Sequence, residues 1–327
     1  MRGWILYRYS LEEMPPDKYE IGRFVENAAR MGIDLNVVKP DQLELVVTRD
    51  DRKSILLDGK AAPLPDFLIP RLGATTNYFA LAIIRHLERL GVTVINSSAA
   101  IEAVRDKLYT QQILAASNLP VPKTMLARFP INIDLVEKQL SFPVVLKTLS
   151  GSQGSGVYLS ENRENFADIA TLLEHTKPDA NIILQEFIAS SRGQDVRVIV
   201  VGGRAVASMR RFSTDGNFKA NVSRGGGSEP FPISPEVEIL ALEATRLLGL
   251  DVAGVDLLFA NDHFKICEVN SSPGFKGMER AHGDEINIAG EIFRYTLARM
   301  GMFEAIKEAT AKLEEPLLPD PELLTES

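Results

Sequence analysis

Two apolar segments in the second half of the chain, residues 252–260 and 264–269, each carry one acidic side chain among hydrophobic neighbours. The short polar stretch 261–263 between them predicts a β-hairpin. Acidic residues embedded in apolar strands are uncommon, so the positions of Asp256 and Glu268 constrain the fold of this segment more than any other feature.

The register of this hairpin decides where the two carboxylates lie. If Ala260 pairs with Phe264, Asp256 lies directly opposite Glu268, with β-carbons only about 5 Å apart on one face of the sheet. Asn270 lies two residues further along the same face. Like charges this close destabilise a sheet unless a cation lies between them.

Asp256, Glu268 and Asn270 would together offer two carboxylates and an amide oxygen. These are hard ligands that suit Mg²⁺ or Mn²⁺ shared with phosphate. The alternative is that the carboxylates point to solvent or to nearby lysines. Cys267 is predicted to face the other way, with Val269, as a small core residue.

Composition limits the class of protein. The chain has 327 residues, 45% hydrophobic and 24% charged, so we expect a globular protein of two or three domains. Lys and Arg number 36 against 44 Asp and Glu, and the net charge of −8 argues against a nucleic-acid partner. The single cysteine excludes an internal disulfide and fits a reducing compartment.

The start of the chain turns polar at Arg8, too early for a signal peptide. No apolar run approaches the ~18–20 residues that span a membrane, so no membrane partner is expected. We therefore expect a cytoplasmic protein.

The first part of the chain alternates short apolar runs with amphipathic segments. Strands are predicted at 4–7, 35–38, 66–69 and 93–95, and helices at 17–31 and 77–90. This alternation predicts a small parallel α/β domain over residues 1–96. Residues 44–47 and 54–57 flank a charged turn and are expected to form a surface hairpin.

Residues 97–300 are predicted to form two α+β lobes, a central lobe at 97–184 and a C-terminal lobe at 185–300, because runs of strands are interrupted by helices. The strands are predicted at 123–127, 144–148, 157–160, 182–187, 196–201, 205–211, 252–260 and 264–269, and the helices at 106–116, 162–174 and 235–248. Residues 301–327 are expected to form a mobile tail, since their end is acidic and carries three prolines.

A glycine-rich turn, 151–156, separates two strand-like runs and follows Lys147. Glycines let a backbone approach a polyanion closely and point several N–H groups toward it. No Gly-Lys-Ser/Thr follows and no helix begins directly behind the turn, so it is neither a P-loop nor a dinucleotide-binding turn. A plain hairpin turn with a surface lysine is the alternative.

Basic residues gather in three stretches between these motifs: 195–197, 209–211 and 218–227. Several cations beside a second glycine-rich stretch predict a local anion pocket, because arginine can donate two parallel bonds to a carboxylate or phosphate. A solvated charged edge is the alternative. The four histidines have no mutual ligand spacing and are interpreted as structural or surface residues.

The order of these pieces resembles the ATP-grasp superfamily and, within it, the RimK-like carboxylate–amine ligases. The resemblance covers roughly residues 66–292. It rests on the segments Ile69-Pro70-Arg71-Leu72-Gly73, Arg105-Asp106-Lys107, Lys147 with 151–156, Gln185-Glu186-Phe187-Ile188, Asp195-Val196-Arg197, Asn221 with Arg224-Gly225-Gly226, Gly254-Val255-Asp256 and Glu268-Val269-Asn270-Ser271-Ser272-Pro273-Gly274.

The resemblance implies an α/β N-terminal domain followed by an α+β ATP-grasp unit, with ATP between its two lobes. Lys107 and Lys147 would contact the phosphates, and Asp195 the ribose. The implied adenine contacts are Gln185, Glu186, Phe187 and Ile188, the implied loop over the nucleotide contains Gly151, Ser152, Gln153 and Gly154, and the implied ligands of two Mg²⁺ or Mn²⁺ ions are Asp256, Glu268 and Asn270.

One segment departs from the family pattern. A Phe-Arg-x-Asn segment that lines the nucleotide in the family reads Phe218-Lys219-Ala220-Asn221 here. Lysine lacks the bidentate donor geometry of arginine. Lys219 and Asn221 are therefore candidate nucleotide contacts, while Arg224 is the better candidate for holding the transferred phosphoryl group.

The reaction that the resemblance implies joins an amine to a carboxylate with ATP as the activating reagent. A carboxylate is a poor electrophile, so we expect phosphorylation to an acyl phosphate before the amine attacks. Lys147, Arg224 and Asn270 are the candidate catalytic residues. Arg71 and Arg210 are candidate contacts to a substrate carboxylate, although a salt bridge between lobes is the alternative for Arg71.

The amino acid is expected to be L-glutamate, and the acceptor a carboxylate on a protein, such as its C-terminus, or on a small molecule. A same-class alternative makes a small metabolite or modifies a carrier protein. Two alternatives from other classes are a non-catalytic nucleotide-binding protein and a kinase that stops at phosphoryl transfer. The sequence leaves open a homo-oligomer.

Overall fold

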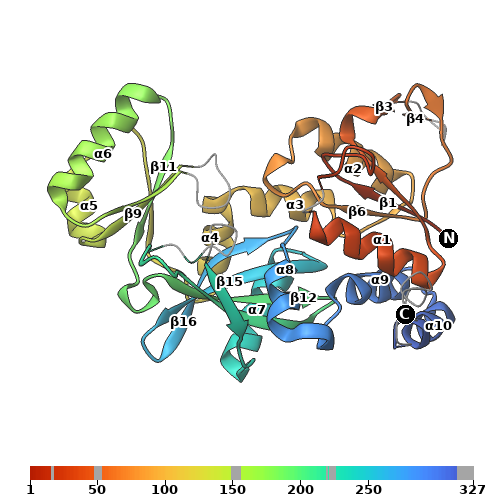
Figure 1. Ribbon diagram of the computed structural model, residues 1–327. Helices are drawn as coiled ribbons and strands as arrows, with labels where there is room; N and C mark the ends of the chain where they lie inside the picture. The colour runs from red at the N-terminus through yellow and green to blue at the C-terminus, as the bar shows by residue number, and fades with distance from the viewer. Residues whose placement is uncertain (16–17, 48–53, 149–155, 219, 221–225, 315–327) are drawn as a thin grey trace, which may run out of the picture. The chain divides into compact units, whose positions relative to one another are not determined.

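The computed structural model describes residues 1–15, 18–47, 54–148, 156–218, 220 and 226–314. The chain divides into two compact units (Figure 1). Unit 1 contains Met1–Pro70, His86–Ile95 and Asn287–Ser327, and unit 2 contains Arg71–Arg85 and Asn96–Ile286.

Unit 1 is built on a parallel four-stranded sheet of order β2-β1-β6-β7, which confirms the predicted parallel α/β domain. Its strands are β1 (Arg2–Leu6), β2 (Asp34–Val38), β6 (Phe67–Pro70) and β7 (Thr93–Val94). Helix α1 (Tyr19–Met31) ends where Gly32 adopts a left-handed φ of 68°, a conformation that favours glycine. The predicted surface hairpin is also present, as β3 (Leu43–Leu45) paired with β4 (Ile55–Leu57), which pairs in turn with β5 (Lys60–Ala61).

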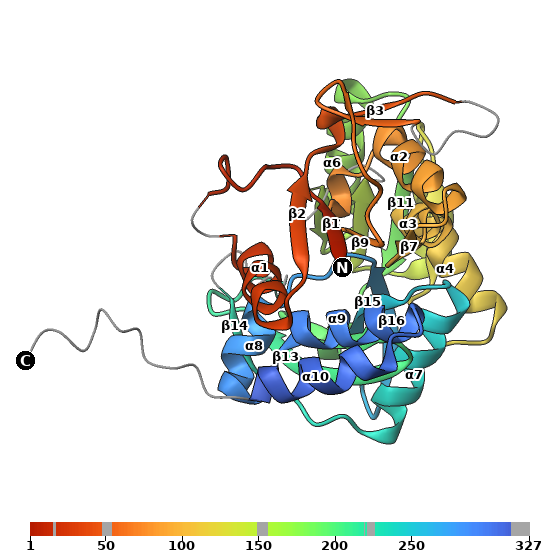
Figure 2. The ribbon, with the colours of Figure 1, turned by 90° about the vertical axis from the view of Figure 1, so that its right-hand side faces the viewer.

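Two C-terminal helices complete unit 1. Helices α9 (Ile288–Arg299) and α10 (Phe303–Glu314) lie beside each other and beside α1 (Figure 2). The ring of Phe293 on α9 packs edge-on against Phe24 and Phe67. Residues 287–300, expected in the C-terminal lobe, group with unit 1 by their contacts, and residues 303–314, expected in a tail, form helix α10. Residues 315–327 lie outside the described residues.

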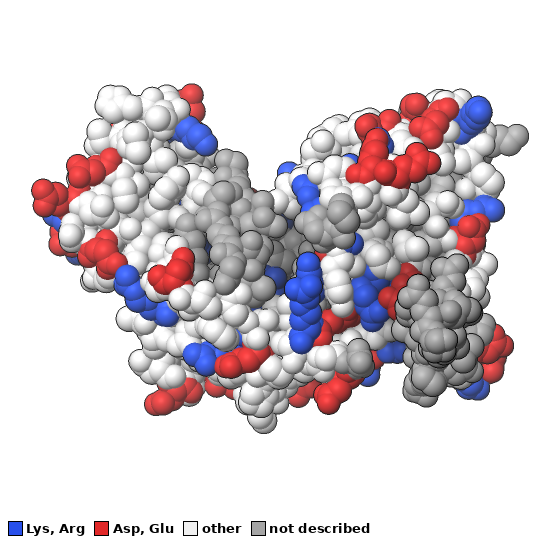
Figure 3. All heavy atoms as spheres, viewed as in Figure 1, with Lys and Arg blue, Asp and Glu red and all other residues white. Residues whose placement is uncertain are grey.

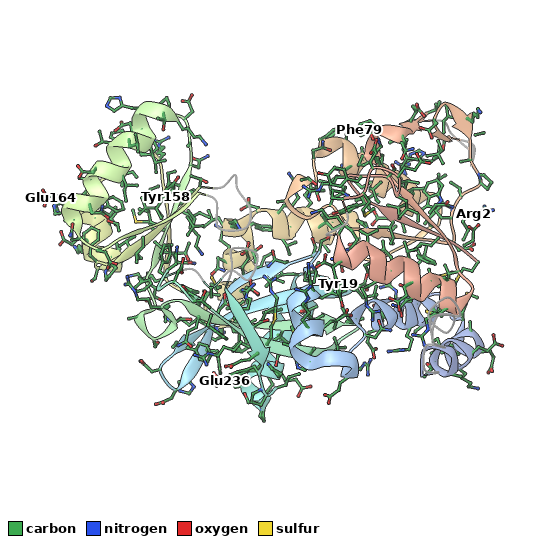
Figure 4. All side chains as sticks on the ribbon, in the orientation of Figure 1. Arg2, Tyr19, Phe79, Tyr158, Glu164 and Glu236 are labelled. Atoms are coloured by element: carbon green, nitrogen blue, oxygen red, sulfur yellow. The ribbon has the colours of Figure 1, made fainter. Side chains whose placement is uncertain are left out.

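Unit 2 contains two antiparallel sheets. The first has the order β10-β9-β11-β8, with β8 (Thr124–Ala127), β9 (Val144–Thr148), β10 (Val157–Ser160) and β11 (Ile182–Glu186). Helices α5 (Ile133–Leu140) and α6 (Arg163–Thr176) cover one face, where Val136 and Phe166 are fully buried against the strands. Glu164 points away from the sheet on the outer side of α6 (Figure 4). The opposite face of this sheet carries Lys147.

The second sheet has the order β14-β13-β12-β15-β16. Its strands are β12 (Gln194–Val201), β13 (Arg204–Phe212), β14 (Gly227–Pro230), β15 (Val252–Ala260) and β16 (His263–Asn270). Apolar side chains on one face pack against α7 (Pro235–Leu247) and against residues of α3 (Ser98–Arg105) and α4 (Lys107–Ala116). Helix α8 (Lys276–His282) contacts β13 and β14. Helix α2 (Tyr78–Arg89) and short 3₁₀ turns at Pro40–Gln42, Gly73–Thr75, Ala189–Ser191 and Gly283–Glu285 complete the described elements.

The hairpin of β15 and β16 differs from the predicted register near its turn. Ala260 pairs with His263, not with Phe264, because Asn261 begins a two-residue turn with a left-handed φ of 57°. A β-bulge next to Asp256 then absorbs one extra residue of β16, and beyond it Asp256 lies directly opposite Glu268. The predicted carboxylate pairing is confirmed, although the predicted turn pairing is wrong.

Charged side chains of both signs are interspersed on the face shown in Figure 3. Among the helices that the structure describes, none combines the length and the apolar character needed to cross a membrane.

Candidate active site

Four charged side chains form an ion-pair network on one face of the second sheet. Asp195 and Arg197 of β12 share this face because side chains alternate along a strand. Arg211 of β13 donates through Nε and Nη2 to Asp195, at 2.6 and 2.7 Å, and Arg197 donates in the same way to Asp256 of β15, at 2.7 Å for both bonds. Arg211 Nη2 also lies 3.1 Å from Asp256 Oδ2 and so joins the two pairs.

The network keeps Asp256 ionised. Burial alone would raise the pKa of this carboxyl, but the Arg197 and Arg211 guanidiniums outweigh burial and lower the pKa to about 2. At Asp195, burial outweighs the attraction of Arg211 and raises the pKa, with the nearby Asp256 charge adding to the effect. Two arginines therefore hold the Asp256 oxygens in a defined direction.

Glu268 faces Asp256 across the ladder but has a different partner. Lys107, the first residue of α4, forms an ion pair with it. Burial would lower the pKa of Lys107, but the Glu268 charge outweighs it and raises this pKa. The alternative drawn from the sequence is that a carboxylate points to a nearby lysine. Glu268 does so in this structure, because it pairs with Lys107.

Lys147 of β9 connects the two sheets of unit 2. Its Nζ donates to Gln185 Oε1 of β11 at 2.6 Å, and Gln185 Nε2 donates to Thr124 Oγ1 of β8 at 2.9 Å. The same Nζ lies 3.7 Å from Cys267 Sγ of β16. Lys147 therefore faces Cys267 and its neighbour Glu268 from the opposite sheet.

The prediction that Cys267 faces away from this site is wrong. Cys267 is the extra residue at the bulge, so it has no partner on β15 and its thiol turns toward Lys147. Burial raises the pKa of the Cys267 thiol, and the Lys147 ammonium offsets only part of this rise.

Several of these groups line one small pocket. It brings together Lys107, Lys147 and Gln185, which the resemblance assigned to the nucleotide, and Glu268, which it assigned to the metal ions. Its full lining consists of Val104, Lys107, Thr110, Gln111, Lys147, Ile183, Gln185, Cys267, Glu268 and Val269. Two cations and one carboxylate therefore face a partly apolar pocket between two β-sheets.

The segment after β11 lies beside this pocket. Glu186 Oε1 accepts from the backbone N–H of Lys123 at 2.8 Å and forms an ion pair with Lys265 Nζ at 2.5 Å. The Phe187 ring lies beneath the Arg192 guanidinium at 5.7 Å, and Ile188 precedes a 3₁₀ turn. The side chain of Glu186 is thus engaged within the protein.

The two candidate substrate arginines lie in different places. Arg71 Nη2 donates to the backbone oxygen of Pro273 at 2.6 Å. Arg210 donates to Gln194 and Glu229, and strand alternation puts it on the sheet face opposite to that of Arg211. The structure does not bring Arg210 together with the ion-pair network.

Several candidate residues lie outside the described residues, and their positions remain predictions. They are Gly151, Ser152, Gln153, Gly154, Lys219, Asn221 and Arg224.

Sequence reasoning missed the site roles of Arg197 and Arg211, which hold Asp256. Both residues stood in the basic stretches, and the alternation of Asp195 and Arg197 on one strand was a usable signal. Their partners became evident only from the strand order β13-β12-β15.

Asn96, which directly precedes Ser97, the N-cap of α3, was also not singled out from the sequence. The buried Asn96 amide accepts from the backbone N–H groups of Asp251 and Val252 and donates to the backbone oxygens of Val252 and Ser271, at 2.6–2.8 Å. Asn96 thereby joins the start of β15 to the residue that follows Asn270.

The loop after Asn270 also packs closely against a glycine, Gly254 of β15. A Cβ added at Gly254 would come within 2.6 Å of the Pro273 Cβ, so only glycine allows this close approach. Gly254 pairs with Asn270 across the ladder. The loop and the last residue of β16 are therefore positioned by packing as well as by Asn96.

The oxygen ligands at this place fit a divalent metal ion. Asp256 is ionised, Glu268 is partly exposed and pairs with Lys107, and Asn270, two residues beyond Glu268 on β16, can supply an amide oxygen. Carboxylate and amide oxygens suit Mg²⁺ and Mn²⁺. Within the described ranges, no three His, Cys, Asp or Glu side chains could hold a metal ion by themselves.

Solved structures of ATP-grasp proteins share this fold over nearly the whole chain. A RimK-domain ATP-grasp protein from Sphaerobacter thermophilus is 21% identical with a TM-score of 0.70, covering 90% of this chain and 99% of that one. D-alanine–D-alanine ligase from Bacillus anthracis is 16% identical with a TM-score of 0.61, covering 92% and 98%. The chain thus has the ATP-grasp fold, which confirms the predicted fold class.

The RimK-like ATP-grasp domain matches residues 104–296, and the RimK PreATP-grasp domain matches residues 13–101. A probable alpha-L-glutamate ligase from Legionella pneumophila (strain Corby) is 38% identical over 283 residues, 86% of this chain and 92% of that protein. One from Marinomonas sp. (strain MWYL1) is 38% identical over 272 residues, 83% and 89%. The chain belongs to the RimK-like ATP-grasp family, and it is an ATP-dependent ligase that joins a carboxylate to an amine.

Proposed function

We propose that this ligase adds L-glutamate to an acceptor carboxylate through an acyl-phosphate intermediate. The observation that carries the proposal is the carboxylate pair Asp256 and Glu268, directly opposed on neighbouring strands and next to Lys107 and Lys147. Glutamate as the amino acid is supported by the relatives that are named alpha-L-glutamate ligases.

The chemical problem is the low reactivity of a carboxylate toward an amine, since its oxygen is a poor leaving group. Transfer of the γ-phosphoryl group of ATP to a carboxylate oxygen forms an acyl phosphate and ADP. The amine then attacks the acyl carbon, and phosphate departs as the amide bond forms. Both steps concentrate negative charge, so the site must supply cations and hydrogen-bond donors.

Asp256, Glu268 and Asn270 would hold the divalent ions, for which we propose two Mg²⁺ or Mn²⁺. When bound, such ions neutralise charge on the phosphate oxygens. Arg197 and Arg211 would act through Asp256 and not by contacting the nucleotide, because their guanidiniums orient Asp256 and keep it ionised. The metal-binding oxygens therefore depend on residues of three neighbouring strands.

Lys107 and Lys147 are proposed to hold the triphosphate, because both ammonium groups line one pocket. Gln185, Glu186, Phe187 and Ile188 are proposed as the adenine contacts and Asp195 as the ribose contact, although Asp195 already receives two bonds from Arg211. The loop containing Gly151, Ser152, Gln153 and Gly154, together with Lys219, Asn221 and Arg224, would cover and polarise the phosphates.

The substrate contacts are proposed at Arg71 and Arg210. Arg71 Nη2 donates to the backbone oxygen of Pro273, in the loop after β16, and a guanidinium can donate two parallel bonds to a carboxylate. Arg210 would serve only an acceptor that extends to the other face of the sheet. The acceptor is proposed to be a protein C-terminus or a small-molecule carboxylate.

A screen of amino acids against acceptor carboxylates tests the proposal, with ADP release and product mass measured together. The expected result is ADP release that requires glutamate and an acceptor, with a product heavier than the acceptor by one glutamyl residue. ADP release that is independent of any amino acid would instead identify a kinase, and no ADP release with any pair would favour a nucleotide-binding protein.

A further inference from the structure

The two opposed carboxylates have counter-ions of different kinds. Asp256 is held by Arg197 and Arg211, whose side chains are 16% and 6% exposed and which come from adjacent strands. Glu268 is held by one lysine from a helix outside the sheet, and the Lys107 and Glu268 side chains are 26% and 40% exposed. The first set of contacts is built into the sheet, whereas the second, within the part of the chain that the structure describes, is one lysine contact near the surface.

These counter-ions differ in how easily they can be exchanged. A bidentate guanidinium is rigid, and removing it from a buried carboxylate would leave an uncompensated charge. A lysine is a point charge on a flexible stem, and a partly exposed lysine–glutamate pair is worth little in stability. Glu268 is therefore the carboxylate that can change partner at low cost.

The Lys107 ammonium has a second possible partner besides Glu268. Its side chain lines the same pocket as Lys147 and Gln185, the pocket that we assign to the nucleotide phosphates. A lysine that leaves Glu268 for an anion in this pocket would remain paired throughout.

We propose that Lys107 is an exchangeable counter-ion that couples metal binding to nucleotide binding. It neutralises Glu268 while no divalent ion is bound, and it turns to the triphosphate when a divalent ion takes Glu268. This inference rests on the proposed function, since it requires Glu268 to be a metal ligand. Coupling of this kind is reciprocal: a metal ion that frees Lys107 tightens nucleotide binding, and a nucleotide that attracts Lys107 tightens metal binding by the same factor.

Mn²⁺ titrations followed by electron paramagnetic resonance test the proposal without turnover, in the presence and absence of the non-hydrolysable analogue AMPPNP. Without nucleotide, Lys107→Met should bind Mn²⁺ about three- to tenfold more tightly than wild type, because the competing ammonium is gone. AMPPNP should strengthen Mn²⁺ binding less in Lys107→Met than in wild type. Lys107→Arg should keep the weak nucleotide-free binding of the wild type, since it retains the competing charge.

Lys39→Met is the matched control for the loss of one positive charge. Lys39 pairs with Glu13, with side chains 20% and 52% exposed, and this pair lies in unit 1. Its Mn²⁺ affinity should equal that of the wild type. Far-ultraviolet circular dichroism and urea unfolding establish that each variant is folded.

Unchanged or weaker nucleotide-free Mn²⁺ binding in Lys107→Met, with binding lost in Glu268→Gln, would overturn the role of Lys107 and leave the metal assignment standing. Mn²⁺ binding in Glu268→Gln equal to that of wild type would overturn the metal assignment and this inference with it.

Discussion

Asp256 and Glu268 are paired across β15 and β16, yet the Asp256 side chain is 8% exposed and the Glu268 side chain 40%. Two like charges at this distance would destabilise the sheet if nothing compensated them. Two arginines compensate one and a lysine compensates the other, so one carboxylate is fixed and its neighbour can exchange its partner.

Arg211→Met should destabilise the protein by about 3–5 kcal/mol, because it leaves Asp195 and Asp256 with less compensation in a buried place. Arg210→Met is the matched control one residue away. Arg210 is partly exposed and pairs with Glu229 on the other face, so its loss should cost about 1 kcal/mol or less. Urea unfolding of both variants measures the difference; equal losses would show that the network contributes no more than a surface pair.

The stability contribution of Asp256 should disappear in acid. Its folded pKa, about 2, is lower than the ordinary value of about 3.9, so its contribution is complete above about pH 4 and is lost as the pH falls toward 2. Asp256→Asn lacks this ionisation. The unfolding free energies of wild type and Asp256→Asn should therefore differ most at pH 6 and converge below pH 4. A constant difference between pH 6 and pH 3 would contradict this assignment.

The thiol of Cys267 should react slowly with iodoacetamide at pH 7.5, because its raised pKa leaves little thiolate. The reaction should accelerate only above the pH at which an ordinary cysteine, of pKa about 8.5, is half ionised. The chain has one cysteine, so intact mass reports this residue alone. Lys147→Met should slow the reaction further, because it removes the ammonium that offsets part of the rise in the pKa of Cys267. Complete modification within minutes at pH 7 would refute the raised pKa of this thiol.

Asn96→Ala should destabilise the protein by about 2–4 kcal/mol, because it removes four hydrogen bonds to backbone groups around β15 and the loop after β16. Asn132→Ala is a suitable control, since Asn132 makes a single exposed cap bond to Leu135 and its loss should cost about 1 kcal/mol. Chemical denaturation compares the two. A cost for Asn96→Ala no greater than that of the control would remove Asn96 from the framework of the site.

The strands and the facing carboxylates could be predicted because both follow from local pattern. Alternation places Asp256 on the face of β15 opposite to the core residues Val255 and Leu257, and the opposing run places Glu268 at nearly the right distance from the turn. The bulge at Cys267 could not be predicted, since it results from a competition between the turn that Asn261 favours and the pairing of the strands beyond it. One shifted residue moved a predicted core thiol into the candidate site.

Contacts between strands and helices that are distant in the sequence could not be predicted either. The hairpin of β12 and β13 places Asp195 opposite Arg211, but the pairing of β12 with β15 joins residues about 60 positions apart and sets Arg197 opposite Asp256. Phe293 of α9 likewise fills the core of unit 1 far from its neighbours in sequence. Periodicity predicts that a segment is a helix, but it carries no information about which domain the helix completes.

Glutamate-dependent ADP release by Glu268→Ala tests the metal assignment most directly, with Glu164→Ala, an exposed glutamate on α6, as the control. The account predicts that Glu268→Ala loses ADP release while its unfolding midpoint stays close to that of the wild type, and that Glu164→Ala keeps full activity. Normal ADP release by Glu268→Ala would contradict it.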